Sequence, residues 1–315
     1  MSKSNRNSPK RSTASESRYT FYEFDGDFPD DASCLEWLVG YLYPEGIHCP
    51  KCERVTKHHR VRSRTAYACQ FCGHHEYPLV GTIFEGSATS LKLWFHAIFL
   101  MSQTRCGISA KQLERELGVT YKTAWRMANK IRSLLQDDND EPLSGEVELD
   151  ETYYGGRRRG TKRGRPGKDS HKTPVFGMAE RKSENSKGRV VAKTVPDTKK
   201  KTVMPHVNKK VLPEAMVYAD EYTVYDSLSR EGYEHERVHH AQEIYVDGNV
   251  HTNTLEGFWS LVKRGIGGVY HSVSSKHLQS YLDEYSFRYN HRGDPEGMFN
   301  AFVSRIEKGD PGAVS

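Results

Sequence analysis

Four cysteines in two pairs constrain the fold of this chain more than any other feature of its sequence. Cys49 and Cys52 are followed by Cys69 and Cys72, in the pattern C-x2-C-x16-C-x2-C. Each pair places two thiolates in one tight turn, and two such turns offer four sulfur ligands to one tetrahedral ion. The spacing therefore predicts a structural Zn²⁺ site in a zinc ribbon, assigned to residues 29–86. A redox dithiol is the alternative, whereas four sulfur ligands leave no open position for a catalytic zinc.

The basic residues of the chain are clustered. Its 315 residues are enough for two or three domains, and the formal net charge is +5. Residues 1–28 begin with a stretch rich in Lys, Arg, Ser and Asn, which predicts a disordered basic arm. We find neither a signal peptide nor an apolar run near the roughly 18–20 residues that span a bilayer. We therefore expect a cytoplasmic protein without a membrane partner.

Residues 87–136 are predicted to be helical, and their second half has a specific pattern. Ser109 and Thr120 are placed to cap two helices that Gly118 separates, an arrangement that resembles a helix-turn-helix. The inward face of the second helix is predicted to hold Ala124, Met127, Ala128 and Ile131. The outward face, which would meet a DNA groove, is predicted to hold Tyr121, Lys122, Arg126, Lys130 and Arg132. A helical hairpin with solvated charges is the alternative.

An acidic linker, DDNDEP at 137–142, is predicted to separate these helices from a domain at 143–295. From residue 145 onward, short apolar runs alternate with helical patterns. The predicted strands are 145–150, 174–180, 188–195 and 215–220, and the predicted helices are 199–212 and 222–230. This order predicts an α/β or α+β sheet.

Two acids come at the ends of predicted strands. In the strand at 147–150, apolar and acidic residues alternate, so Glu148 and Asp150 share one face. Asp220 ends a later strand, and we expect it to lie beside Asp150 on an adjacent strand. Three nearby acids are interpreted as surface groups at the strand edges: Glu148, Glu151 and Glu221.

The segment HTNTLEGFWSLVKRG, at 251–265, is predicted to be a helix. Its apolar stripe consists of Leu255, Trp259 and Val262. Another face gathers Asn253, Glu256 and Lys263, which would bring an oxygen ligand and a cation to one place. An acid and a lysine on one helix are also typical of a solvated face. This pattern alone does not distinguish a functional site from a solvated face.

Together, these motifs resemble the DDE transposases of the RNase H-like superfamily. Asp150, Asp220 and Glu256, with the trailing Lys263, are similar to its D, D, E and K, with 35 residues between the second and third acids. The zinc ribbon, the helix-turn-helix, LDETYYGG, ADEY, HTNTLEGFWSLVKRG and FRYNHR follow in the order of a group of bacterial insertion-sequence transposases. This group is ISXO2-like and related to the eukaryotic Merlin elements. The resemblance covers roughly residues 30–295.

The resemblance implies an α/β architecture in which an RNase H-like mixed sheet follows the zinc ribbon and the helix-turn-helix. It implies two Mg²⁺ (or Mn²⁺) ions held by Asp150, Asp220 and a third residue, with Lys263 near substrate phosphate. The subgroup often has Asn as the third residue, here Asn253. Glu256 is favoured because a carboxylate binds hard cations better than an amide does. The implied partners are double-stranded DNA, as element ends and target, and further copies of the chain in a synaptic complex.

The loop at 155–172 carries eight Lys or Arg residues against one Asp. Its glycines and proline argue against a helix, and we expect the phosphate backbone of DNA as its partner. The candidate DNA-binding residues are Arg157, Arg158, Arg159, Lys162, Arg163 and Arg165. A solvated run of charge is the alternative.

Residues 296–315 are predicted to be a C-terminal tail. They follow a predicted amphipathic helix whose packing residues are Leu278, Tyr281, Leu282 and Tyr285.

The sequence predicts a transposase that cleaves and joins DNA at the ends of an insertion sequence. Two alternatives remain, namely a DNA-binding regulator with a catalytically silent domain and a nuclease or resolvase that cuts branched DNA. The presence of Asp150, Asp220 and Glu256 together favours the transposase.

Overall fold

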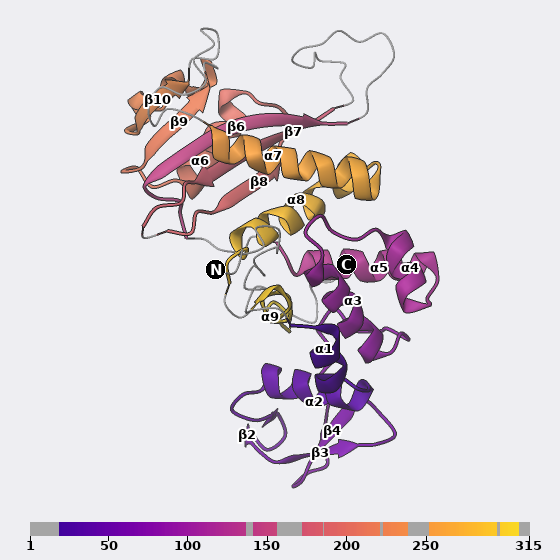
Figure 1. The fold of residues 1–315 in the computed structure, drawn as a ribbon. Coiled ribbons are helices and arrows are strands. Elements are labelled where there is room, and N and C mark those ends of the chain that lie inside the picture. The colour runs from indigo at the N-terminus through magenta and orange to yellow at the C-terminus, as the bar shows by residue number, and fades with distance from the viewer. Residues whose placement is uncertain are drawn as a thin grey trace, which may run out of the picture. The chain divides into compact units, whose positions relative to one another are not determined.

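The computed structural model of the chain (Figure 1) describes residues 19–136, 141–155, 172–184, 186–220, 223–238, 252–294 and 297–308. The chain divides into two compact units. The first holds the described residues up to Gln103 together with those from Asp294 onward, and the second runs from Thr104 to Gly293. In the described part of the chain, no helix combines the length and the apolar composition needed to cross a membrane.

Aromatic side chains hold the helices of the first unit together. These helices are α1 (Phe21–Asp27), α2 (Asp31–Leu42), α3 (Leu91–Gln103) and α9 (Gly297–Val303). The ring of Phe24 stacks on Phe99 at 4.8 Å between centroids, and Phe299 lies within 6.2 Å of both. Parts of the predicted basic arm and of the predicted tail are therefore helices, α1 and α9. Helices this short are stabilised by packing against distant segments, which local composition does not reveal.

Short antiparallel strands carry the cysteine pairs in the same unit. The strands are β1 (His48–Cys49), β2 (Arg54–Val55), β3 (His58–Val61), β4 (Ala66–Cys69) and β5 (His75–Glu76). β1 pairs with β2, and β3, β4 and β5 form a three-stranded sheet. Cys49 and Cys69 are each the last residue of a strand, so each pair of cysteines begins at a strand end and continues into the turn that follows.

A mixed five-stranded sheet forms the centre of the second unit. Its strands are β6 (Glu146–Tyr154), β7 (Thr173–Glu180), β8 (Val190–Thr194), β9 (Met216–Asp220) and β10 (Glu234–Val238), in the order β10-β9-β6-β7-β8. β6 runs parallel to β9 and antiparallel to β7. The predicted α/β class with a mixed sheet is confirmed. β10 was not predicted because its sequence, EHERV, is mostly charged.

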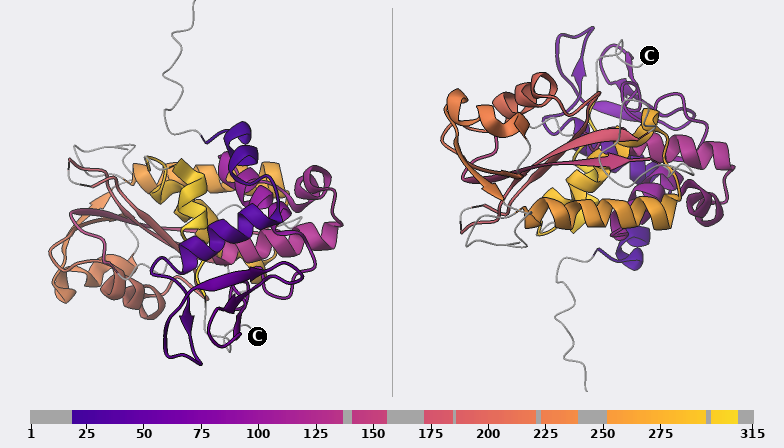
Figure 2. Two further views of the ribbon diagram at one scale, coloured as in Figure 1. Left: turned by 90° about the horizontal axis from the view of Figure 1, so that it is seen from below. Right: turned by 90° about the horizontal axis from the view of Figure 1, so that it is seen from above.

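The two faces of this sheet are covered by different helices (Figure 2). On one face, Val147 and Leu149 of β6 are buried together with residues of α6 (Lys200–Lys210) and of the short helix η1 (Thr223–Ser227). On the other face, α7 (Asn253–Gly265) and α8 (Ser275–Asn290) bury their apolar residues against β7 and β8. Because side chains alternate along a strand, Glu148 and Asp150 lie on the α7 face.

The predicted pair of capped helices is present as α4 (Ala110–Leu117) and α5 (Tyr121–Ser133). Ser109 and Thr120 cap them through their side chains, and Gly118 has a φ of 64°, in the left-handed region that glycine tolerates. The four residues predicted to face inward are buried. The predicted helical region 87–136 spans both units, because α3 belongs to the first unit whereas α4 and α5 belong to the second.

Arg132, near the end of α5, was predicted to face outward, and this was wrong. Its side chain is buried, and its Nε donates to Glu284 of α8 at 2.7 Å. Its guanidinium also lies over the ring of Tyr281, 4.2 Å from the centroid. The partner acid lies on a helix far along the chain, which explains why a local pattern assigned Arg132 to the surface. This ion pair fastens α5 to α8.

Candidate active site and metal centre

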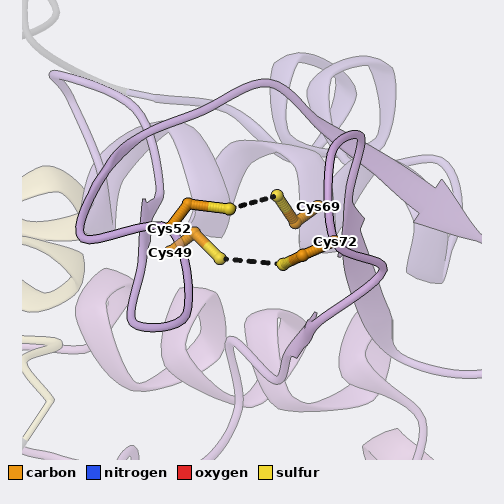
Figure 3. A group of neighbouring side chains, drawn as sticks. All are labelled: Cys49, Cys52, Cys69 and Cys72. Carbon is orange, nitrogen blue, oxygen red and sulfur yellow. Dashed lines mark hydrogen bonds between the residues drawn. The ribbon is translucent and has the colours of Figure 1, made fainter.

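The four cysteines converge from two turns (Figure 3). The sulfur atoms of Cys49 and Cys72 lie 3.4 Å apart, and those of Cys52 and Cys69 lie 3.9 Å apart. Tetrahedral zinc with bonds of about 2.3 Å places its sulfur ligands about 3.8 Å from one another. The cluster therefore fits one zinc ion with four sulfur ligands, as the spacing predicts.

One neighbour favours the thiolate form of Cys69. The hydroxyl of Thr56 lies 3.2 Å from Cys69 Sγ. This hydrogen bond, together with those from the backbone N–H groups of Cys72 and Phe71, lowers the pKa of the Cys69 thiol to about 5. The ionised sulfur is the form that binds a metal, so Thr56 supports the role that the spacing assigns to Cys69.

A group of three carboxylates lies where β6 and β9 run side by side. Leu149 of β6 is opposite Ala219 of β9, so the residues that follow them, Asp150 and Asp220, are neighbours. Oxygen atoms of Asp150, Glu151 and Asp220 all lie within 4.8 Å of one another. The expectation that Asp150 and Asp220 lie on adjacent strands is confirmed.

Glu151 belongs to this group, and its interpretation as a surface group was wrong. It is half-buried, and the hydroxyl of the buried Tyr225 donates to its Oε1 at 2.6 Å. Strand alternation directs neighbouring residues to opposite faces, so it separated Glu151 from Asp150. The available signal was its position directly after Asp150, at the point where the acids of two strands meet.

Asp150 is held by two hydrogen bonds. Trp259 of α7 donates from Nε1 to Asp150 Oδ2 at 2.9 Å, and the backbone N–H of Glu151 donates to Oδ1 at 2.8 Å. Gly177 is opposite Asp150 on β7. A Cβ atom at Gly177 would lie 2.3 Å from Trp259 Cζ2, so only glycine lets the indole lie this close to the sheet. The two hydrogen bonds, one from α7 and one from its own strand, fix the orientation of the Asp150 carboxylate.

The electrostatics at Asp150 favour a cation. Burial, together with the carboxylates of Asp220 and Glu256, raises the pKa of Asp150 to about 7. The hydrogen bonds from Trp259 and from the backbone oppose the rise. A divalent cation would compensate the negative charge that these carboxylates concentrate.

The three predicted site residues on α7 are all exposed. Glu256 lies in the first turn, 3.4 Å from the Thr252 hydroxyl, and its charge acts on Asp150. Among the described residues, the group within 4.8 Å does not include Glu256. Asn253 begins the helix and Lys263 lies in its last turn. The structure thus brings Glu256 close to the acidic group without joining it to that group.

Glu148 was interpreted as a surface group, and this was also wrong. It is fully buried beneath α7, where Arg181 and the backbone of Leu255 donate to its carboxylate. The alternation of the strand placed it on the same face as Asp150, but nothing local showed that a helix covers that face. Glu221 lies outside the described residues.

The candidate DNA-binding residues lie on α5 and in the loop at 155–172. Tyr121, Lys122 and Arg126 are exposed, and Lys130 is half-buried. The basic residues of the loop, from Arg157 to Arg165, lie outside the described residues. α5 therefore presents an exposed polar and basic face at its N-terminal end.

Comparison with known proteins identifies the family. Residues 142–290 match the model of the ISXO2-like transposase domain, and residues 29–75 match the transposase zinc-ribbon domain. A Halobacterium salinarum protein, described as an uncharacterized protein in transposable element ISH50, is 30% identical over 277 residues, which cover 83% of this chain and 91% of that protein. This chain belongs to the ISXO2-like transposase family. The cysteine cluster lies in the first matched region and the acidic group in the second.

Two further similarities are weaker. An uncharacterized transposase-like protein from Haemophilus influenzae is 28% identical over 104 residues, which cover 33% of this chain and 83% of that protein. Among solved structures, the crystal structure of a pre-cleavage Mos1 transpososome aligns at 12% identity over 69% of this chain and 79% of its own. Its TM-score of 0.23 is too low to establish a shared fold.

Proposed function

We propose that this chain is a transposase that binds the ends of an insertion sequence and catalyses metal-dependent cleavage and strand transfer of DNA. The observation that carries the proposal is the acidic group, in which Asp150, Glu151 and Asp220 meet within 4.8 Å. Several carboxylates at one point are the ligands that hard divalent cations require. We assign the surrounding mixed sheet to the RNase H-like fold that the sequence resemblance implies.

The reaction has two phosphoryl-transfer steps. Water attacks a phosphodiester at the element end and releases a 3′-hydroxyl. This hydroxyl then attacks a phosphodiester of target DNA and displaces a 3′-hydroxyl of the target strand. Two Mg²⁺ or Mn²⁺ ions, when bound, activate the attacking oxygen and stabilise the leaving oxygen. In this proposal Asp150 and Asp220 hold these ions, Glu151 lies within reach of them, and Glu256 contributes from α7. Asn253 orients or supplements Glu256, and Lys263 contacts substrate phosphate.

DNA binding is assigned to the α4–α5 pair, taken as a helix-turn-helix, and to the basic loop. The exposed Tyr121, Lys122 and Arg126, with Lys130, would contact the groove and its phosphates. The zinc ribbon is held by one structural Zn²⁺. Because two element ends must meet in one synaptic complex, the proposal includes a homo-oligomer.

The test uses labelled duplexes that carry the inverted repeats flanking the gene, with the full-length protein and Mg²⁺. We expect cleavage at the repeat end and joining to target DNA by the wild type. Asp150→Ala should abolish both reactions and leave duplex binding within about threefold, because phosphate contacts rather than Asp150 supply the affinity.

Other outcomes would overturn the proposal. Cleavage without joining indicates a nuclease or resolvase, and binding without cleavage by the wild type indicates a regulator. If Asp150→Ala cleaves as fast as the wild type, the acidic group is not the active site.

A further inference from the structure

Two carboxylates of β6 face α7, and they differ in what they contact. Asp150 belongs to the acidic group, whereas Glu148, two residues earlier, does not. Glu148 is fully buried. Its Oε1 accepts from Arg181 Nε at 2.8 Å, and its Oε2 accepts from the backbone N–H of Leu255 at 2.9 Å.

The contact with Leu255 supplies a cap that α7 does not provide for itself. The side chain of the N-cap residue Thr252 does not accept a hydrogen bond from a backbone N–H of the first turn. Leu255 is the third residue of the helix, and its N–H has no acceptor within the helix. N-cap side chains normally bind this N–H, and a negative charge here also interacts favourably with the helix dipole. Glu148 performs this function from the neighbouring strand.

α7 is attached to β6 at a second point, where Trp259 donates to Asp150. The two acceptors, Glu148 and Asp150, are two strand residues apart, a rise of about 6.7 Å. The two donors, Leu255 and Trp259, are four helix residues apart, a rise of about 6.0 Å. The rises of the two residue pairs are similar, and both hydrogen bonds join α7 to β6. Glu256 lies between the two donor residues in the sequence.

Arg181 makes the burial of Glu148 possible. Besides its bond to Glu148, it donates from its terminal nitrogen to Glu146 Oε2 at 2.8 Å, and its guanidinium lies 4.1 Å from the ring centroid of Tyr218. A buried carboxylate without a cation is strongly unfavourable. The charge of Glu148 is therefore compensated by Arg181, which leaves its second oxygen for α7.

We propose that Glu148 is a positioning residue that fastens the first turn of α7 to β6 and so sets where Glu256 stands relative to Asp150. Loss of this attachment weakens binding of divalent cations at the acidic group. The attachment itself follows from the contacts above. Its effect on metal binding rests on the proposed function.

Amide hydrogen exchange of the full-length protein, without added Mg²⁺ or Mn²⁺, tests the attachment. Glu148→Ala is compared with Glu146→Ala, a matched control on the same strand face. Glu146 also pairs with Arg181, but among the described residues its side chain does not hydrogen-bond to α7. Glu148→Ala should speed exchange in the first turn of α7 about fivefold, the effect of losing a helix cap. Glu146→Ala should leave that turn unchanged.

Glu148→Gln keeps a carbonyl oxygen that can accept from Leu255, and it should restore most of the protection. This variant also serves if Glu148→Ala does not fold. Equal exchange in the first turn for Glu148→Ala and Glu146→Ala overturns the attachment. So does protection in Glu148→Gln that is as low as in Glu148→Ala.

A Mn²⁺ titration followed by electron paramagnetic resonance tests the consequence. Glu148→Ala should weaken Mn²⁺ binding about tenfold, the usual effect of losing a residue that orients a ligand, and Glu146→Ala should change it less than about twofold. Unchanged Mn²⁺ affinity in Glu148→Ala overturns this inference, even where Asp150→Ala is inactive. Wild-type cleavage by Asp150→Ala overturns the proposed function instead, and the exchange result is independent of it.

Discussion

The cysteine cluster of the first unit and the acidic group of the second both gather side chains that suit a metal ion, by different physical means. Each cysteine pair is formed within one turn, so a few consecutive residues of the sequence determine its geometry. The acids come from two parallel strands, β6 and β9, and meet only because the sheet aligns Leu149 with Ala219. The first site depends on the metal to hold its turns together, whereas the second depends on the sheet and α7.

The largest expected effect is the removal of zinc. Metal binding to a cysteine cluster stabilises a small domain by as much as about 10 kcal/mol in favourable cases. A chelator selective for zinc should therefore abolish amide protection in β3–β5 and leave the protection of β6 and β9 within about twofold, since the sheet does not use the cysteines. Hydrogen exchange, with zinc release followed by a colorimetric dye, measures both. Retained protection of β3–β5 after zinc release would show that these strands do not depend on the metal.

The fold was more predictable than the site. Strand period, helix caps and the CxxC turns are local signals, and they located four of the strands of the central sheet, the α4–α5 pair and the cysteine cluster. Asp150 and Asp220 were also predicted to be neighbours, because each ends the apolar run of a predicted strand. Arg132 and Glu148 were misplaced because their partners, Glu284 and Leu255, lie on helices remote in the sequence. Burial of a charged residue is decided by such partners.

The next largest effect concerns the third acid. Glu256→Gln should lower the cleavage rate by about 10² to 10³, because an amide replaces a carboxylate where hard cations bind, and each factor of ten is about 1.4 kcal/mol in the barrier. Asn253→Ala should lower it less than about tenfold, since a neutral amide supplies less of the binding. Single-turnover cleavage of labelled ends measures both rates. A larger loss in Asn253→Ala would make Asn253 the third residue.

The pH dependence of the free energy of unfolding measures how far the buried carboxylate of Asp150 destabilises the folded protein. Burial raises the pKa of Asp150 to about 7, against about 3.9 for an unfolded aspartate. The folded state therefore holds a proton that the unfolded state has lost, and the stability that this proton contributes disappears as the pH rises through 7. Without added Mg²⁺ or Mn²⁺, the wild type should lose up to about 3 kcal/mol relative to Asp150→Asn between pH 5 and pH 8.

Urea denaturation with zinc retained measures this difference. Addition of Mg²⁺ at pH 8 should restore stability to the wild type and not to Asp150→Asn, because the cation takes the place of the proton. A stability difference that does not change with pH would show that Asp150 is ionised throughout.

The smallest effect tests how closely α7 must approach the sheet. Gly177→Ala places a Cβ atom 2.3 Å from Trp259 Cζ2, and such overpacking costs about 1–2 kcal/mol. The control is Gly257→Ala, on the exposed side of α7, where an added Cβ meets nothing within 4 Å. This control should stabilise the protein by up to about 1 kcal/mol through helix propensity. Urea denaturation measures the change in the free energy of unfolding for both variants. Changes of opposite sign would show that the loss in Gly177→Ala comes from the tight contact with Trp259 and not from a backbone effect of replacing glycine. If Gly177→Ala is neutral, Trp259 has room to move, and the acidic group tolerates a looser α7 than its contacts indicate.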